Sequence, residues 1–366
     1  MKPLAVMGAS GFVGVRLVEM FHLSGRAPVR PIVHRPASLA ALARFQLDPR
    51  LANYADPAAL AKALEGCDTL VHLATADANV IREMTTPVYE AAARAGVRRI
   101  VFTSSASVHG QAPAPGSTER SPLPRHHLFP YNAAKADAEK RLLAARANGS
   151  VELVILRPGI VWGPRSRWVT DTIHAARAGT FGWLNGGRGL INPIYVDNLV
   201  HAIDRACDAK VDGEIFLLND PEPATWREFF TPWIEATGLS PEKTPDAPPF
   251  VAARGLSAKF ERLRVHPFSQ RLAPKIPRGL KRAAKAIVSS LPEAPPPDPF
   301  AGLDPEKAPQ PARLTEEMTE LQRCAWRFPV EPATTRLGWQ SRVDWPTAVE
   351  RTLGWLRFAE MLPPKN

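Results

Sequence analysis

The sequence predicts an α/β protein: a doubly wound parallel sheet joined to a smaller, mostly helical C-terminal domain. Over the first 220 residues, short apolar runs alternate with stretches of helical periodicity. The runs are continuous in Val, Ile and Leu, as in strands that are buried on both faces of a parallel sheet. After about residue 240 the composition changes, because fifteen of the 38 prolines fall within 241–313. Regular structure is therefore expected mainly before this region and again near the C-terminus.

Each predicted element follows from a local pattern. Strands are expected where the apolar runs lie, at residues 4–7, 29–34, 68–74, 98–104, 151–157 and 214–219. Helical periodicity predicts helices at residues 12–22, 79–95 and 131–147. Near the C-terminus, apolar residues at helical spacing predict a last helix that includes Trp345, Val349, Leu353 and Leu356.

Composition limits the classes of protein that fit. The chain of 366 residues is 45% apolar and 22% charged, which is ordinary for a globular protein. Its three cysteines lie far apart without a CxxC or Cys/His cluster, so neither a disulfide framework nor a metal site is expected. No secretory signal or long apolar run is present, which predicts a cytoplasmic protein. Residues 241–300 hold 11 Lys/Arg against 5 Asp/Glu, but without interleaved aromatics or a known module they do not predict nucleic-acid binding.

The segment GASGFVG, residues 8–14, follows the first strand and opens a helix. Gly8 permits a tight turn, Gly11 lets the backbone approach a pyrophosphate, and Gly14 lets the helix pack closely on the strand. The helix N-terminus then offers amide donors and a positive dipole end to the phosphates. This predicts a dinucleotide site of the Rossmann type, with cofactor-binding residues Gly8, Ser10, Gly11, Phe12, Val13 and Gly14.

The end of the second strand bears on which dinucleotide is bound. NAD sites usually carry an acid there for the ribose 2′-hydroxyl, whereas this chain has His34 and Arg35 and no acid. A guanidinium matches a 2′-phosphate in shape and charge. NADP is therefore the predicted cofactor, with His34 and Arg35 among its binding residues. NAD is left open, and the alternative interpretation of Arg35 is an exposed surface side chain.

These patterns also predict a domain division. Residues 1–165 are expected to form an NADP-binding Rossmann domain, which residues from about 190 to 219 complete. Residues 166–189 and 220–366 are expected to form the substrate-binding region, including a Pro-rich basic insertion at about 241–325.

An ordered set of motifs resembles a known family, the extended short-chain dehydrogenase/reductases, also described as NAD-dependent epimerase/dehydratases and 3β-hydroxysteroid dehydrogenase-like enzymes. The motifs keep the family's order and spacing over about 220 residues, and the LGW segment near the C-terminus resembles the family's closing segment. They are GASGFVG 8–14, LVHLAT 70–75, VRRIVFTSSASVHG 97–110, PYNAAKADAE 130–139, LRPGIVWGP 156–164 and IYVDNLVHAI 194–203. The set is specific for the family but not for a substrate.

The resemblance implies a catalytic set of Ser105, Tyr131 and Lys135. Tyr131 would be the general acid/base, and Lys135 would hold the nicotinamide ribose and lower the tyrosine's pKa. The spacing supports this, because residues at i and i+4 share a helix face and a nearby ammonium favours a phenolate. Ser105 would polarise the substrate oxygen, with Ser104 as the alternative for that role. Further cofactor contacts are implied for Asn53, Leu73, Ala74, Thr75, Pro158, Ile160 and Val161.

The sequence departs from the family pattern at four positions. Asn53 takes the place of the usual adenine-contacting Asp, and the helical active-site Asn aligns near Ile81, which leaves Asn79 as a displaced candidate. Ile160 stands where nucleotide-sugar members carry an Asn that contacts the substrate diphosphate. An apolar side chain cannot serve a pyrophosphate, so a nucleotide-sugar substrate is disfavoured. His109 replaces a common Tyr and is interpreted as structural.

The predicted function is therefore an NAD(P)-dependent oxidoreductase that moves hydride between nicotinamide and a secondary alcohol or ketone of an apolar small molecule. A sugar epimerase or dehydratase and a non-catalytic cofactor-sensing protein are the alternatives. The segment 277–291 predicts an amphipathic helix with a basic face. Packing against the substrate domain and peripheral contact with the inner membrane surface are both left open for it, and so is a homodimer.

Overall fold

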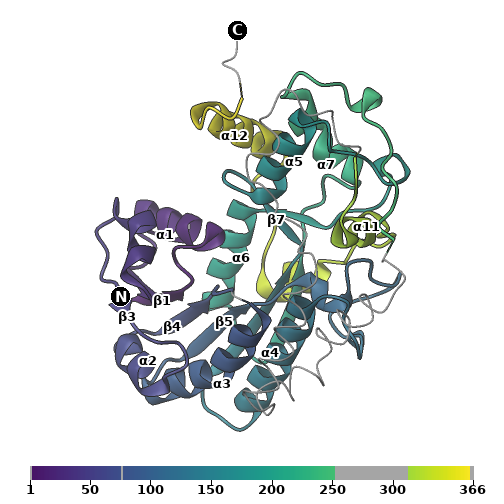
Figure 1. The fold of residues 1–366 in the computed structure, drawn as a ribbon. Coiled ribbons are helices and arrows are strands. Elements are labelled where there is room, and N and C mark those ends of the chain that lie inside the picture. The colour runs from purple at the N-terminus through teal and green to yellow at the C-terminus, as the bar shows by residue number, and fades with distance from the viewer. Residues whose placement is uncertain (1, 76, 252–311, 363–366) are drawn as a thin grey trace, which may run out of the picture.

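The computed structural model of the chain describes residues 2–75, 77–251 and 312–362. A seven-stranded parallel sheet forms its centre, in the order β3-β2-β1-β4-β5-β6-β9 (Figure 1). All six predicted strands lie in this sheet. The seventh strand, β3, has only two residues and is too short to show an apolar pattern in the sequence. The strands are β1 (Leu4–Met7), β2 (Val29–Val33), β3 (Arg50–Leu51), β4 (Thr69–His72), β5 (Arg99–Thr103), β6 (Glu152–Pro158) and β9 (Glu214–Leu218).

Helices cover both faces of the sheet, as the doubly wound pattern predicted. Side chains alternate between the two faces along a strand, so Leu4 and Val6 of β1 pack in one core cluster while Ala5 and Met7 pack in the other. The first cluster is covered by α1 (Phe12–Ser24) and α6 (Val196–Asp208). The second is covered by α2 (Pro57–Leu64), α3 (Ala78–Arg94) and α4 (Pro130–Ala147). Short helical turns join these elements at η1 (Pro36–Leu42) and η2 (Ala106–His109).

A second, smaller layer stands beyond the carboxyl ends of the strands. It contains a two-stranded parallel sheet, β7 (Ile160–Trp162) and β8 (Pro193–Tyr195), which three-residue runs could not reveal in the sequence. Its core is aromatic: the Trp162 ring lies 4.8 Å from that of Trp345 and also packs against Phe229. The remaining elements are α5 (Arg167–Arg177), η3 (Asn185–Gly187), α7 (Trp226–Glu235), η4 (Pro241–Lys243), α11 (Glu316–Gln322), η6 (Ala333–Leu337) and α12 (Trp345–Phe358). The predicted last helix is α12.

The C-terminal part of the chain packs on both layers. Leu356 of α12 is buried in the aromatic core of the smaller layer. Between α11 and α12, however, Leu337 and Trp339 are buried against the α1/α6 face of the main sheet. The indole Nε1 of Trp339 donates to the Asn198 carbonyl at 2.9 Å. One segment therefore ties the two layers together.

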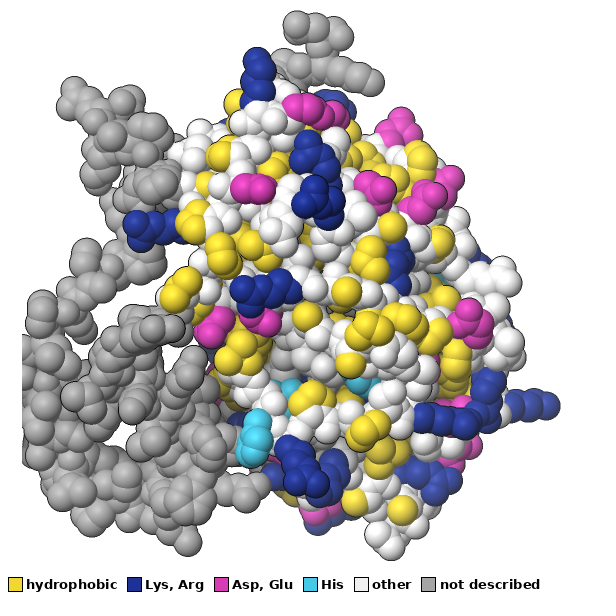
Figure 2. Space-filling model, turned by 90° about the vertical axis from the view of Figure 1, so that its right-hand side faces the viewer, with side chains coloured by type: hydrophobic (Ala, Val, Ile, Leu, Met, Phe, Trp, Pro, Cys, Tyr) yellow, Lys and Arg dark blue, Asp and Glu magenta, His cyan; other side chains and the backbone are white. Residues whose placement is uncertain are grey.

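The predicted basic helix 277–291 lies outside the described residues, as does most of the insertion. On the face shown in Figure 2, Lys and Arg side chains are interspersed with acidic and hydrophobic ones rather than gathered in one patch. Within the described ranges, no helix is long and apolar enough to cross a membrane. The same ranges hold no group of His, Cys, Asp and Glu that could bind a metal ion, and all three cysteines are buried and unbridged.

Candidate active site

A cleft of about 450 Å³ opens at the carboxyl ends of β1, β4, β5 and β6, between the main sheet and the smaller layer. Strand ends of a doubly wound sheet are where such folds bind ligands, because the loops there diverge to opposite faces. Most of the sequence-predicted site residues line this cleft. They are Gly8, Gly11, Phe12, Val13, Gly14, Leu73, Thr75, Ser105, Tyr131, Pro158, Ile160 and Val161.

The glycine loop has the tight packing that its pattern predicted. Gly8 has a left-handed φ of 80°, and a Cβ on it would lie 2.6 Å from the Ala74 nitrogen. A Cβ on Gly14 would lie 2.1 Å from the Gly8 carbonyl oxygen, so the start of α1 touches the loop directly. Gly11 caps α1 without any side-chain hydrogen bond to its first amides. The loop therefore leaves a helix N-terminus facing the cleft with backbone donors available.

The other predicted residues lie around the cleft rather than in its lining. His34 and Arg35 are exposed beyond β2, and the described residues give Arg35 no ion-pair partner. Asn53 is exposed, and its side-chain oxygen accepts a hydrogen bond from the Ala55 amide at 3.1 Å. The remaining predicted residues outside the lining are Ser10, Ala74 and Lys135.

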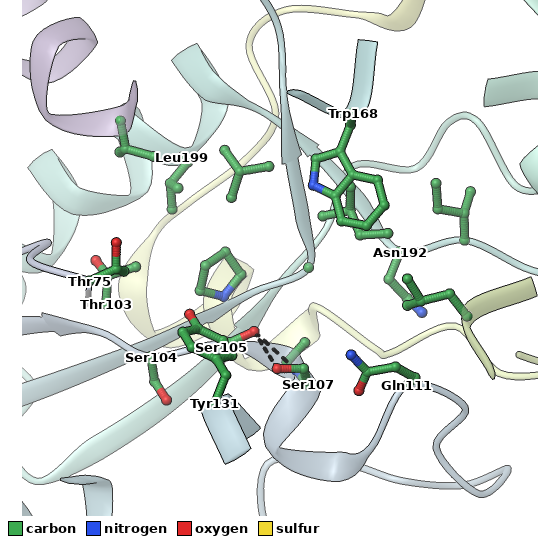
Figure 3. A pocket seen from close by; sticks show the side chains of 18 of the residues that line it. Thr75, Thr103, Ser104, Ser105, Ser107, Gln111, Tyr131, Trp168, Asn192 and Leu199 are labelled. Carbon is green, nitrogen blue, oxygen red and sulfur yellow. Dashed lines mark hydrogen bonds between the residues drawn. The ribbon is translucent and has the colours of Figure 1, made fainter. Parts of the chain in front are cut away.

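Three serines follow the end of β5 and line the cleft. The Ser105 hydroxyl shares a hydrogen bond of 2.9 Å with the Ser107 hydroxyl and accepts another from the Ser107 amide at 3.2 Å. The side chain of Ser104 is buried and its hydroxyl has no partner among the described residues. Figure 3 shows Ser105 and Tyr131 at one end of the cleft and Trp168 at the other. Both serines that the sequence proposed thus reach the site, and Ser105 has the hydrogen-bonded orientation.

Tyr131 and Lys135 lie one turn apart near the start of α4, as their spacing predicted. Lys135 is fully buried behind the tyrosine, where its Nζ donates to the Thr103 carbonyl at 2.9 Å. The same Nζ stands 5.9 Å from the centroid of the Tyr131 ring and 4.8 Å from that of Phe102. The pair therefore has the arrangement of a tyrosine with a cation held beneath it.

The predicted lowering of the tyrosine's pKa by Lys135 stays a prediction, because the other groups around Tyr131 act on this pKa as well. Desolvation, with the negative charge of Glu317 as the second cause, raises the pKa of Tyr131 to about 12, although the residue is 37% exposed. Burial also lowers the pKa of Lys135 to about 8, against the charge of Glu139, which acts to raise it. Desolvation disfavours the charged form of each group, the phenolate of Tyr131 and the ammonium of Lys135.

A buried ion pair fixes α4 behind these residues. Glu139 accepts three hydrogen bonds from Arg157 of β6: two from Nε, at 3.0 and 3.2 Å, and one from Nη2 at 2.6 Å. Both side chains are buried. Arg157 Nη1 also donates to Nε2 of His109 at 2.9 Å. Burial lowers the pKa of His109 to about 4, with Arg157 as a further cause, so this imidazole is neutral. His109 therefore supports the site from outside the cleft, consistent with its structural interpretation.

Several residues that line the cleft were not predicted from the sequence, and four of them have polar or aromatic side chains of interest here. Gln111, Trp168 and Asn192 form the wall opposite the sheet, and Glu317 comes from the distant C-terminal helix α11. No local motif marks them, because they meet only through the tertiary fold. The displaced candidate Asn79 instead lies exposed at the start of α3 and does not line the cleft.

The residues present fit a dinucleotide cofactor. The glycine loop keeps side-chain carbon away from the space in front of α1, where a Cβ on Gly8 or Gly14 would collide with backbone. The uncapped first amides of α1 suit the two phosphates of such a cofactor. Away from the glycine loop, the cleft is lined by the hydroxyls of Ser105 and Tyr131. These groups could hydrogen-bond the oxygen of a carbonyl substrate.

Fold and site together define a Rossmann-type nicotinamide-dinucleotide enzyme. The chain belongs to the NAD dependent epimerase/dehydratase family, whose model matches residues 4–218. It is an NAD(P)-dependent oxidoreductase of the extended short-chain dehydrogenase/reductase type.

Among its curated relatives is the 4-hydroxy-2-methyl-3-oxo-4-farnesyl-3,4-dihydroquinoline-1-oxide ketoreductase of Stigmatella aurantiaca. It is 30% identical over 271 residues, which cover 70% of this chain and 79% of the relative. The 3beta-hydroxysteroid-dehydrogenase/decarboxylase isoform 1 of Arabidopsis thaliana is 28% identical, over 64% of this chain and 61% of that protein. A solved dTDP-glucose 4,6-dehydratase, DesIV from Streptomyces venezuelae with NAD and TYD bound, has a similar fold. Its TM-score is 0.67 at 19% identity, over 98% of both chains.

Proposed function

We propose that this protein is an NADP(H)-dependent oxidoreductase that interconverts a ketone and a secondary alcohol on an apolar small molecule. The observation that carries the proposal is the make-up of the cleft. Hydroxyl groups gather at the sheet end, and the wall beyond them is largely apolar, with Ile160, Trp168, Leu190, Trp226 and Phe328. Apolar walls with a few polar anchors suit a carbonyl compound of low polarity.

The chemistry divides among three side chains. The nicotinamide, when bound, supplies the hydride to the carbonyl carbon or takes it back. In the direction of reduction, the Tyr131 hydroxyl gives its proton to the carbonyl oxygen, and a pKa raised to about 12 keeps that proton in place at neutral pH. Ser105 donates a hydrogen bond to the same oxygen and stabilises the negative charge that develops on it. Lys135 would hold the ribose side of a bound cofactor, and its ammonium, 5.9 Å from the centroid of the Tyr131 ring, would favour the phenolate that proton transfer leaves on the tyrosine.

A nucleotide sugar is a poorer fit to the cleft. Among the described residues that line it there is no Lys or Arg to pair with a diphosphate. A charged nucleotide entering such a wall would lose hydration without recovering hydrogen bonds. The similarity to sugar-nucleotide enzymes lies in the fold, at 19% identity for the dehydratase above. The Stigmatella relative, by contrast, is named as the ketoreductase of a farnesyl-bearing ring compound.

The choice of NADP rests on Arg35. This arginine follows β2, where the ribose 2′ position of a dinucleotide lies in Rossmann sites, and the exposed His34 precedes it. Since no carboxylate pairs with Arg35 in the described part of the chain, its guanidinium remains available to a 2′-phosphate.

The test is NADPH oxidation over a panel of apolar ketones, with UDP- and dTDP-sugars beside them. We expect steady NADPH consumption with at least one ketone, at least ~10²-fold slower turnover for Tyr131→Phe, and nearly unchanged cofactor binding. Tyr89→Phe is the matched control, because the Tyr89 hydroxyl is buried against the Val151 backbone and does not line the cleft. Micromolar binding of a nucleotide sugar would instead support the epimerase alternative. Full activity of Tyr131→Phe would remove the tyrosine from the mechanism.

A further inference from the structure

We infer that Glu317 is a specificity-determining residue that disfavours anionic substrates at the reacting end of the cleft, so that the substrate is uncharged. The inference rests on the proposed function and narrows its substrate class. It depends on the position of one carboxylate, supplied by a helix from the far end of the chain.

Glu317 is the one charged side chain among the described residues that line the cleft. Its only hydrogen bond given by the structure comes from Gln111, whose Nε2 donates to the Glu317 Oε1 at 3.1 Å. No ion pair with Glu317 occurs in the described ranges, whereas the neighbouring Glu320 pairs with Arg323 at 2.6 Å. Within the described residues, the exposed Glu317 carboxylate therefore has no ion-pair partner.

This carboxylate stands close to the reacting end of the cleft. Gln111 accepts a hydrogen bond from the Asn132 side chain at 2.6 Å, and Asn132 follows Tyr131 in α4. A chain of two hydrogen bonds thus leads from the catalytic helix to Glu317. The charge of Glu317 also reaches the tyrosine electrostatically, since it contributes to the raised pKa of Tyr131.

The helix that carries Glu317 is held firmly on the cleft. The indole Nε1 of Trp226 donates to the Leu321 carbonyl at 3.0 Å, and the Leu190 amide donates to the Cys324 carbonyl at 2.7 Å. The Gln322 side chain accepts from the Leu184 amide at 2.9 Å. A Cβ on Gly189 would lie 1.9 Å from the Gln322 carbonyl oxygen, so backbone touches backbone here. These contacts hold the backbone of the helix, and the helix backbone in turn positions the Glu317 carboxylate.

The negative charge of Glu317 repels a substrate carboxylate or phosphate placed beside it at the reacting end of the cleft, away from the start of α1 where the cofactor phosphates are expected. Since Glu317 is exposed, salt weakens this repulsion. Like-charge juxtaposition is a common way for proteins to reject a competing ligand. An uncharged ketone meets no such repulsion. Glu317 thereby makes the cleft favour neutral ketones over keto acids. The apolar walls alone would give a weaker preference.

The experiment compares two acetophenones of nearly the same shape, 4-acetylbenzoate and its methyl ester. Binding is measured by calorimetry to the protein saturated with NADP⁺, at low ionic strength so that the charge effect is not screened. Ketone and NADP⁺ are both oxidised, so no turnover disturbs the titration. The variants are Glu317→Gln, which can still accept the Gln111 hydrogen bond, and Glu317→Lys. Glu316→Gln is the matched control, because Glu316 precedes it in α11 but does not line the cleft.

We expect the wild type and Glu316→Gln to bind the ester at least about tenfold more tightly than the carboxylate, a difference of about 1.4 kcal/mol. Glu317→Gln should narrow that ratio at least threefold, and Glu317→Lys should reverse the preference. Apolar walls alone would also disfavour the carboxylate, so the change between variants is the decisive quantity. An ester-to-carboxylate ratio that is the same in wild type and Glu317→Gln overturns the inference. Failure of the wild type to bind either compound overturns it together with the proposed substrate class, whereas binding with the expected ratio but no NADPH turnover contradicts the proposed function alone.

Discussion

Replacing Gly14 by alanine tests how the glycine loop supports both stability and cofactor binding. The new Cβ would lie 2.1 Å from the Gly8 carbonyl oxygen and 2.7 Å from the Ala9 Cα. Ordinary contact begins near 3.4 Å, so the start of α1 must move away from β1 by about 1.3 Å. The atoms in the way belong to the backbone, and no side-chain rotation can relieve the clash.

The expected net effect is a loss of stability. Overpacking of this kind costs about 1–3 kcal/mol, and backbone contact puts Gly14→Ala near the upper end. Because alanine is a better helix former than glycine, the substitution also stabilises α1 by about 1 kcal/mol. The difference leaves the variant about 2 kcal/mol less stable, which corresponds to a fall in Tm on the order of 4 °C or more. Because α1 presents the phosphate-binding amides, its displacement should also weaken NADPH binding at least about tenfold.

Gly11→Ala is the control that separates the two effects. Gly11 has an ordinary φ of −75°, and its Cβ would meet only the Gly8 carbonyl oxygen, at 3.3 Å. This variant should melt close to the wild type in the absence of cofactor, yet bind NADPH more weakly because the methyl group faces the phosphates. Thermal melting without ligand and fluorescence titration with NADPH are the two assays. The reasoning is refuted if Gly14→Ala melts and binds like the wild type.

Further predictions follow from the same geometry. In binding titrations, NADPH should bind at least about tenfold more tightly than NADH. Arg35→Ala should abolish this preference for NADPH. The control Arg44→Ala, which removes a surface ion pair with Glu19, should keep it. In alcohol oxidation, where the phenolate is the base, Glu317→Gln should move the rising limb of the pH–rate profile to lower pH, because the Glu317 charge raises the pKa of Tyr131. Burial lowers the pKa of His109 to about 4, so the unfolded chain takes up the proton first as pH falls below the ordinary value. Chemical denaturation should then show about 1.6 kcal/mol less stability at pH 5 than at pH 6.5 from this group. A stability that does not change over this pH range would contradict the burial of His109 as a neutral base.

Two kinds of feature could be predicted from the sequence. The six main strands are continuous apolar runs long enough to show their burial on both faces, and the glycine spacing of residues 8–14 requires close backbone packing that few other arrangements need. The spacing of Tyr131 and Lys135 predicted a shared helix face, since helical geometry is local. These signals are local, because periodicity and turn geometry depend on residues that are close together in the sequence.

The outer wall of the cleft depended on tertiary structure. Glu317 meets Gln111 across 206 positions of the chain, and neither residue lies in a pattern that predicts the contact. The short strands β7 and β8 are likewise recognisable only once they pair.

The electrostatics of the site were decided in the same way. The sequence put an ammonium one turn from a phenol and so predicted a lowered pKa for Tyr131. The fold buries Lys135, leaves Tyr131 37% exposed and adds the charge of Glu317. Desolvation and that charge together raise the pKa of Tyr131. Spacing along a helix determines which side chains are neighbours, whereas the solvent and charge around them depend on every segment that packs there, and these segments come together only in the folded chain.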